Sequence, residues 1–203
     1  MKKFILIILI PIIFTQCYGK NAIRDKTATS QSESFWVSDS EKFALEYPLV
    51  DSNNLFVYRT AEQTAQILEK GTGVVFIGFK ECIWCQLYAV FLHETALEMN
   101  INRIFYCDIR NDRLNNTESY KRISSILDGL LQYDDEGNPR VYVPDVTIVN
   151  NGKITGRDFE TSKYTLGYET PEEYWNTDRV TALKDRFKEN MAQLSNQSCN
   201  SCD

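Results

Sequence analysis

The chain has 203 residues and a formal net charge of −6, which is enough for one ordinary domain with extensions. Its acidic balance, without any basic stripe, gives no support to nucleic-acid binding. Hydrophobic residues make up 43% and charged residues 25% of the chain, as in globular proteins. Six cysteines are too few for a disulfide scaffold of this length. The single histidine, His93, leaves little for a histidine-based metal or catalytic site.

The first residues predict export. A short basic start is followed by the apolar run Phe4–Phe14 and then by polar sequence, the pattern of a signal peptide that we assign to residues 1–19. The run is too short to span a bilayer comfortably. Two processing routes are open: a lipoprotein signal that ends before Cys17 and leaves a lipid anchor on it, or an ordinary cut after Gly19. Either route predicts an exported bacterial protein at the periplasmic or extracellular face of the membrane.

Residues 20–54 are expected to form a flexible tether and N-terminal extension, with a short helix at the domain edge started by the capping box Ser38 to Glu41. The domain itself is assigned to residues 55–194, and residues 195–203 form a C-terminal tail. The expected strands are Leu55–Tyr58, Val74–Phe79, Arg103–Ile109, Asp145–Val149 and Lys153–Thr155. The expected helices are 60–71, Ile83–Met99, Thr117–Leu131 and Asp178–Leu194, with a helical turn at Thr170-Pro171.

This order of elements predicts an α/β fold with a central mixed β-sheet flanked by helices on both faces. Parallel crossovers build the first half of the sheet, and an antiparallel hairpin with Asn151-Gly152 at its turn completes it.

The chemistry is predicted at Cys82 and Cys85, a C-x-x-C pair between the apolar strand Val74–Phe79 and the helix that follows. A helix N-terminus has unpaired N–H groups and a partial positive charge, which stabilise a thiolate. Cys82 is therefore the expected nucleophile, and Cys85 the residue that resolves a mixed disulfide. An inert disulfide and a zinc site shared with Cys199 and Cys202 are the alternatives.

The arrangement of the C-x-x-C pair after an apolar strand, with Val143-Pro144 opening a later strand of a hairpin, resembles the thioredoxin superfamily across residues 55–194. The resemblance implies a thioredoxin-like fold and a cis peptide bond before Pro144, beside the redox pair. It also implies that Val143 and Pro144 present backbone to the substrate chain, and that neither an organic cofactor nor a metal is required. More narrowly, the chain resembles bacteriocin-transport accessory proteins.

Two departures from the thioredoxin pattern concern the active pair. Ile83 and Trp84 replace the Gly-Pro of thioredoxins, and a partly exposed Trp84 is a candidate for substrate contact. Phe76 occupies the position of a buried acid, so that proton acceptor is absent. The positive charge of Lys80 favours a thiolate at Cys82 and the negative charge of Glu81 opposes it, so the two effects roughly cancel.

Other residues are ambiguous. The tail pair Cys199 and Cys202 is either a small surface disulfide or a second redox pair that exchanges with the first; one tail cysteine could instead bond Cys107 or a partner. We expect Cys107 to be a buried small hydrophobe and His93 a solvated or packing residue. The tyrosine-rich stretch 164–175 either covers a sheet edge or forms a partner surface.

Together these patterns predict an extracytoplasmic thiol–disulfide oxidoreductase that forms, reduces or isomerises disulfides. Its substrates are cysteine-containing extracytoplasmic proteins or peptides, and a separate redox partner of unknown identity recycles it. The alternative is a non-catalytic binding or assembly factor for a secretion or envelope partner. A peroxide reductase is disfavoured because no Thr-x-x-Cys arrangement stands at the pair.

Overall fold

A computed structural model describes residues 38–159 and 167–195 of the chain. The expected signal peptide with Cys17, most of the tether, and the tail pair Cys199 and Cys202 lie outside these residues. Within them, no helix is both long and apolar enough to cross a membrane.

A five-stranded mixed sheet forms the centre of the described chain, as the sequence predicts. Its strand order is β1 (Phe56–Tyr58), β3 (Ile104–Asp108), β2 (Gly73–Gly78), β6 (Asp145–Asn150) and β7 (Lys153–Asp158). The first three strands are parallel, β6 runs antiparallel to β2, and β7 runs antiparallel to β6. Every residue of β2 after the first is buried, which explains why its sequence is continuously apolar rather than alternating.

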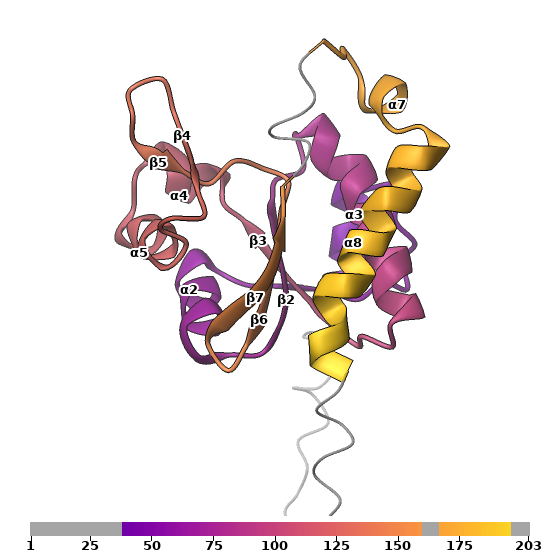
Figure 1. The fold of residues 1–203 in the computed structure, drawn as a ribbon, viewed down its shortest axis with the longest axis horizontal. Coiled ribbons are helices and arrows are strands. Elements are labelled where there is room, and N and C mark those ends of the chain that lie inside the picture. The colour runs from indigo at the N-terminus through magenta and orange to yellow at the C-terminus, as the bar shows by residue number, and fades with distance from the viewer. Residues whose placement is uncertain (1–37, 160–166, 196–203) are drawn as a thin grey trace, which may run out of the picture. The chain divides into compact units, whose positions relative to one another are not determined.

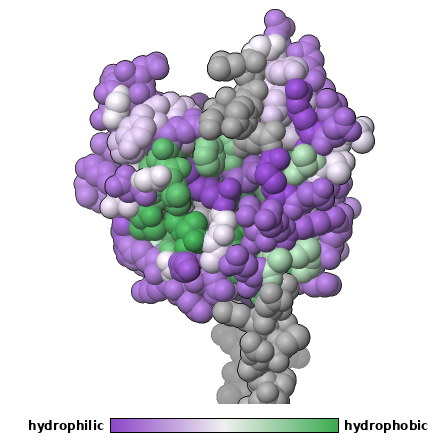
Figure 2. Space-filling model, in the orientation of Figure 1, coloured by the Kyte–Doolittle hydropathy of each residue, from purple (hydrophilic) through white to green (hydrophobic). Residues whose placement is uncertain are grey.

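Helices cover both faces of the sheet (Figure 1), which confirms the expected α/β layering. One core lies beneath α2 (Ala61–Lys70) and α5 (Glu118–Ile126), and the other beneath α1 (Asp39–Glu46), α3 (Ile83–Glu98) and α8 (Thr177–Ser195). Alternate residues of β2 point into the two cores, as the pleat of a strand requires. Figure 2 shows an apolar patch where α2, α5 and β7 meet; their partly buried hydrophobics include Ile67, Ile126 and Ile154.

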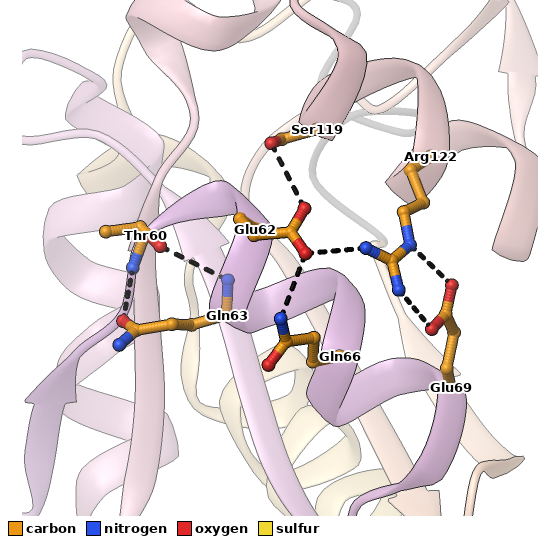
Figure 3. Close-up of polar contacts among 7 residues, drawn as sticks. All are labelled: Thr60, Glu62, Gln63, Gln66, Glu69, Ser119 and Arg122. Carbon is orange, nitrogen blue, oxygen red and sulfur yellow. Dashed lines mark hydrogen bonds and ion pairs between the residues drawn. The ribbon is translucent and has the colours of Figure 1, made fainter.

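Polar contacts start α2 and join it to α5 (Figure 3). Thr60 Oγ1 accepts a hydrogen bond from the N–H of Gln63 at 3.2 Å, and the Gln63 side chain accepts one from the N–H of Thr60 at 3.0 Å, so a capping box starts this helix. Arg122 of α5 donates to Glu62 and bidentately to Glu69 of α2. A bidentate pair within a network holds its geometry better than an isolated surface ion pair.

The helix α1 belongs to the core, although the sequence analysis placed it in an extension at the domain edge. The Phe43 ring stacks on Phe56 with centroids 3.8 Å apart, and both side chains are buried. The buried Tyr47 hydroxyl donates to the hydroxyl of Tyr106 on β3 at 3.0 Å. The expected capping box at Ser38 is present, but Phe43 is the one buried residue within the helix, which is too weak a pattern to reveal how deeply the helix packs.

The predicted end of one helix is wrong, and two leucines on or after the predicted helices are exposed. The expected helix Thr117–Leu131 ends at Ile126, and Leu130 is 45% exposed. On α3, Leu97 is 51% exposed. The buried face of that helix consists instead of Cys85, Tyr88, Ala89, Leu92, His93, Thr95 and Ala96. Because α3 lies between the sheet and other helices, apolar residues occur all around it, and periodicity alone does not identify its most buried side.

Further elements were not expected from the sequence. A short helix, α4 (Arg110–Leu114), follows β3, and β4 (Gln132–Tyr133) and β5 (Pro139–Arg140) form a small hairpin. The helical turn α7 (Pro171–Tyr174) starts at Thr170 as expected. These short elements lie around the edge of the sheet where β2 and β3 end, and there they shape the candidate site.

The turn between β6 and β7 depends on glycine at position 152. Gly152 has a φ of +75°, and a Cβ there would lie 2.0 Å from the carbonyl oxygen of Glu69. Gly137, in the β4–β5 loop, has a φ of +83° but nothing within 4 Å of its Cβ position. The two glycines therefore share the backbone constraint and differ in the space around them.

We predict that Gly152→Ala destabilises the protein more than Gly137→Ala. Both variants bear the cost of a left-handed alanine, about 1–2 kcal/mol, and only Gly152→Ala adds overpacking of roughly 1–3 kcal/mol. Urea unfolding of both variants and wild type measures the difference. Equal losses of unfolding free energy would contradict this account of the turn.

Candidate functional site

The two cysteines lie where β2 passes into α3. Cys82 is the N-cap residue of α3, and its Sγ accepts a hydrogen bond from the backbone N–H of Cys85 at 3.2 Å. The N–H of Cys82 donates to the carbonyl of Phe79 at 3.1 Å, which closes the turn after the strand. Both cysteines are free thiols; Cys82 is partly exposed and Cys85 is buried. One sulfur is therefore accessible from solvent, and the second lies behind it.

The surroundings of the two thiols move their pKa values apart. The pKa of Cys82 is lowered, first by a hydrogen bond from the Cys85 thiol and then by the backbone N–H groups of Cys85 and Trp84. Burial raises the pKa of Cys85, and the neighbouring Cys82 raises it further. The first cysteine is therefore the one that loses its proton more readily, and the second is the one that holds it more strongly.

A cation that the sequence analysis missed lies beside the pair. The charge of Arg113, on α4, helps to lower the pKa of both Cys82 and Cys85. Its guanidinium is 5.3 Å from the ring centroid of Phe79, and its Nη1 donates to the carbonyl of Val141 at 3.2 Å. Arg113 is 28 positions from Cys85 along the chain, on a helix of five residues without a hydrophobic pattern, so no local signal identified it.

The charged residues adjacent in sequence to the pair have partners of their own. Lys80 is 3.8 Å from Glu46 of α1, and Glu81 forms an ion pair with Arg110 of α4 at 2.9 Å. Lys80 and Glu81 were expected to have opposite effects on a Cys82 thiolate. Each of them instead has an oppositely charged partner on a helix.

The start of β6 lies at the same edge of the sheet as the cysteines. Ile77 pairs with Asp145 in the antiparallel register of β2 and β6. If this register continues by one residue, Pro144, which is buried, lies opposite Gly78. The Val143–Pro144 peptide bond is cis, as the resemblance implies. Asp145 is buried; it accepts hydrogen bonds from Thr147 and from Nε of Arg157, each at 2.8 Å.

Trp84 forms one rim of the site, as expected for a partly exposed side chain. Its ring meets that of Tyr174 of α7 edge to face, with centroids 5.9 Å apart. Neighbouring Ile83 is 53% exposed. Tyr174 and Trp175, from the stretch expected to cover a sheet edge or a partner, are instead buried against α3. Residues 164–166 of that stretch lie outside the described residues.

A tyrosine hydroxyl lies near Cys85, in the region behind the turn. A Cβ on Gly78 would lie 3.3 Å from Cys85 Sγ and 3.4 Å from the Tyr47 hydroxyl, so the sulfur and the phenol share one small region behind the turn. Burial raises the pKa of Tyr47 far above its ordinary value. Tyr47 is therefore a neutral hydroxyl near Cys85, and not a base. No local signal in the sequence marks Tyr47, which lies in the segment predicted to be an extension.

The described residues contain no cluster of three or more histidine, cysteine or acidic side chains that could hold a metal. The zinc alternative depends on Cys199 and Cys202, which lie outside them. His93 is buried, with its ring 6.2 Å from that of Phe56, which matches a packing role. Cys107 is buried as expected, and burial raises its pKa to about 12.

Comparison of the chain with protein-family models, with curated proteins and with solved structures finds no match. Functional inference therefore depends on the geometry of the site.

We predict that Cys85→Ala raises the pKa of Cys82, because it removes the thiol hydrogen bond that lowers this pKa most. Ultraviolet thiolate absorbance, titrated against pH, measures the change. Cys107→Ala is the matched control, since Cys107 is buried on the opposite face of the sheet. Identical Cys82 titrations in wild type and Cys85→Ala would refute the role given to the second thiol.

Proposed function

We propose that this protein is a thiol–disulfide oxidoreductase with a thioredoxin-like fold, and that Cys82 is its nucleophile. One observation carries the proposal: Cys82 Sγ caps α3 and accepts the N–H of Cys85, with its pKa lowered, while the buried Cys85 lies directly behind it. A structural disulfide does not need this asymmetry between an accessible thiolate and a buried thiol.

The reduction of a substrate disulfide proceeds in two exchanges. The Cys82 thiolate attacks one substrate sulfur, the substrate S–S bond breaks, and the departing thiolate takes a proton from water. Cys85 then loses its proton and attacks Cys82 Sγ. The Cys82–Cys85 disulfide forms and the second substrate thiol leaves, so two electrons pass to the substrate. The reverse sequence oxidises a substrate dithiol.

The second exchange is favoured by the change at Cys82 itself. Part of the raised pKa of Cys85 comes from its hydrogen bond and charge interaction with Cys82. Both vanish when Cys82 becomes a neutral sulfur in the mixed disulfide. The Cys85 pKa then falls, which increases the thiolate available for resolution. Tyr47, close to Cys85, is a neutral hydroxyl at the buried side of the pair.

The residues before β6 provide a place for the substrate chain. Pro144 has no N–H, and Val143 is partly exposed next to it. In the proposal the backbone around Val143 pairs with an extended substrate segment, as in other strand-addition complexes. Trp84, held by Tyr174, contacts the substrate from the opposite side.

We further propose that the protein acts outside the cytoplasm on cysteine-containing proteins or peptides, since its N-terminal sequence has the pattern of an export signal. A lipid on Cys17 would tether it to the membrane. The recycling partner supplies or removes the two electrons, and Cys199 and Cys202 remain candidates for an internal relay. The closer likeness to bacteriocin-transport accessory proteins also remains a proposal.

The alternative of a non-catalytic binding factor depends on aromatic residues that hold a partner. Two of those aromatics, Tyr174 and Trp175, are buried against α3. Because buried side chains are not available to hold a partner, this observation does not favour the binding factor, and we propose only the catalytic function.

Insulin reduction by dithiothreitol tests the proposal. Wild-type protein should accelerate the reduction, and Cys82→Ser should return it to the uncatalysed rate because the attacking thiolate is lost. Cys85→Ser should instead accumulate a mixed disulfide with substrate, visible by non-reducing electrophoresis. Cys107→Ala controls for the loss of a thiol outside the site. Equal rates for wild type and Cys82→Ser would sink the catalytic proposal and revive the binding factor.

A further inference from the structure

We infer that a polar groove beside the dithiol binds acidic side chains of the substrate, so that the enzyme prefers disulfides flanked by glutamate or aspartate. This inference rests on the proposed function. It names the class of substrate, and it assigns Arg113 and Arg140 as the residues that recognise the carboxylates.

The groove lies between α4, α5 and the β4–β5 hairpin, three elements grouped on one side of the sheet (Figure 1). It has a volume of about 710 Å³, which is within the usual range for ligand sites. Hydrophilic residues cover the hairpin on the visible face (Figure 2). A groove of this volume has room for several side chains of an extended peptide.

Two guanidinium groups in the groove have hydrogen-bonding capacity to spare. The Nε atoms of Arg113 and Arg140 are buried, and neither has a hydrogen-bond partner among residues 38–159 and 167–195. No carboxylate in that part of the chain lies within ion-pair distance of either group. The two arginines are close enough that Arg140 helps to lower the pKa of Arg113. A carboxylate that pairs with both guanidinium groups from the groove would relieve this repulsion.

The other charged residues of the groove have partners outside this pair. Lys121 forms an ion pair with Glu118 at 2.6 Å. Asp134 accepts the backbone N–H groups of Glu136 and Asn138 within its own loop, although Arg140 is near enough to lower its pKa. Asp128 accepts the backbone N–H of Gly129. The cationic donors that lack a hydrogen-bond partner in the described part of the chain are therefore the Nε groups of the two arginines.

Arg113 connects the groove to the chemistry. Its Nη1 donates to the carbonyl of Val141, two residues before Val143, and its guanidinium faces Phe79 of the turn that carries Cys82. A substrate segment paired along Val143 and extended past Val141 reaches Arg140 next. A carboxylate a few residues from the substrate cysteine would then lie in the groove while the cysteine meets Cys82.

The test uses two fluorescent peptides that share one internal disulfide and differ only in flanking residues, glutamate in one and lysine in the other. Binding to the full-length Cys82→Ser/Cys85→Ser protein is measured by anisotropy, so that no electron transfer is needed. The glutamate peptide should bind about tenfold more tightly than the lysine peptide, as one charge-assisted contact allows. Added salt should weaken that preference.

Three variants in the same background sharpen the test. Arg140→Gln should abolish the preference, and Arg140→Glu should reverse it in favour of lysine, a gain that a misfolded protein would not show. Arg103→Gln is the matched control: Arg103 is exposed and precedes β3, at the opposite edge of the sheet from the cysteines. It should leave both affinities unchanged.

Equal affinity for the two peptides would overturn the inference. So would inorganic phosphate alone binding as tightly as the glutamate peptide, because the peptide chain would then contribute nothing. These outcomes are independent of insulin reduction. A protein that reduces insulin but ignores flanking charge keeps the proposed function and loses only this specificity.

Discussion

The antiparallel pairing of β2 with β6 is the constraint on which the site depends. It aligns Ile77 with Asp145, so that the turn leading to Cys82 and the segment ending at Pro144 emerge at one edge of the sheet. Neither half of the site works alone in the proposed chemistry: the turn supplies the sulfur, and the segment supplies backbone for a substrate. The burial of β2 on both faces holds this pairing in place, because a slip of one residue would exchange the two cores.

Around this edge, polar groups are arranged by depth. Cys82 is accessible and accepts N–H groups, whereas Cys85 is buried next to the neutral hydroxyl of Tyr47. The same edge carries the cation of Arg113, held by Val141 and Phe79. In the proposed mechanism, this difference between a partly exposed thiol of lowered pKa and a buried thiol of raised pKa separates the roles of attack and resolution.

Much of the architecture was predictable because its signals are local. The capping boxes at Ser38 and Thr60 start the expected helices, and Asn151-Gly152 marks the hairpin turn. The apolar run of β2 indicates a central strand. In contrast, α4 and the β4–β5 hairpin have only a few residues each, too few for any periodicity to appear above chance.

The sequence by itself determined the order of the main strands and helices, the mixed character of the sheet that this order implies, and the position of a C-x-x-C pair at a helix start, because their signals lie in neighbouring residues. Only the tertiary structure decided which distant groups surround that pair. Tyr47 and Arg113 reach the cysteines through the packing of α1 and α4 on the sheet edge. Their effect on the cysteines depends on distance and burial in the folded protein, and neither can be read from the spacing of residues along the chain.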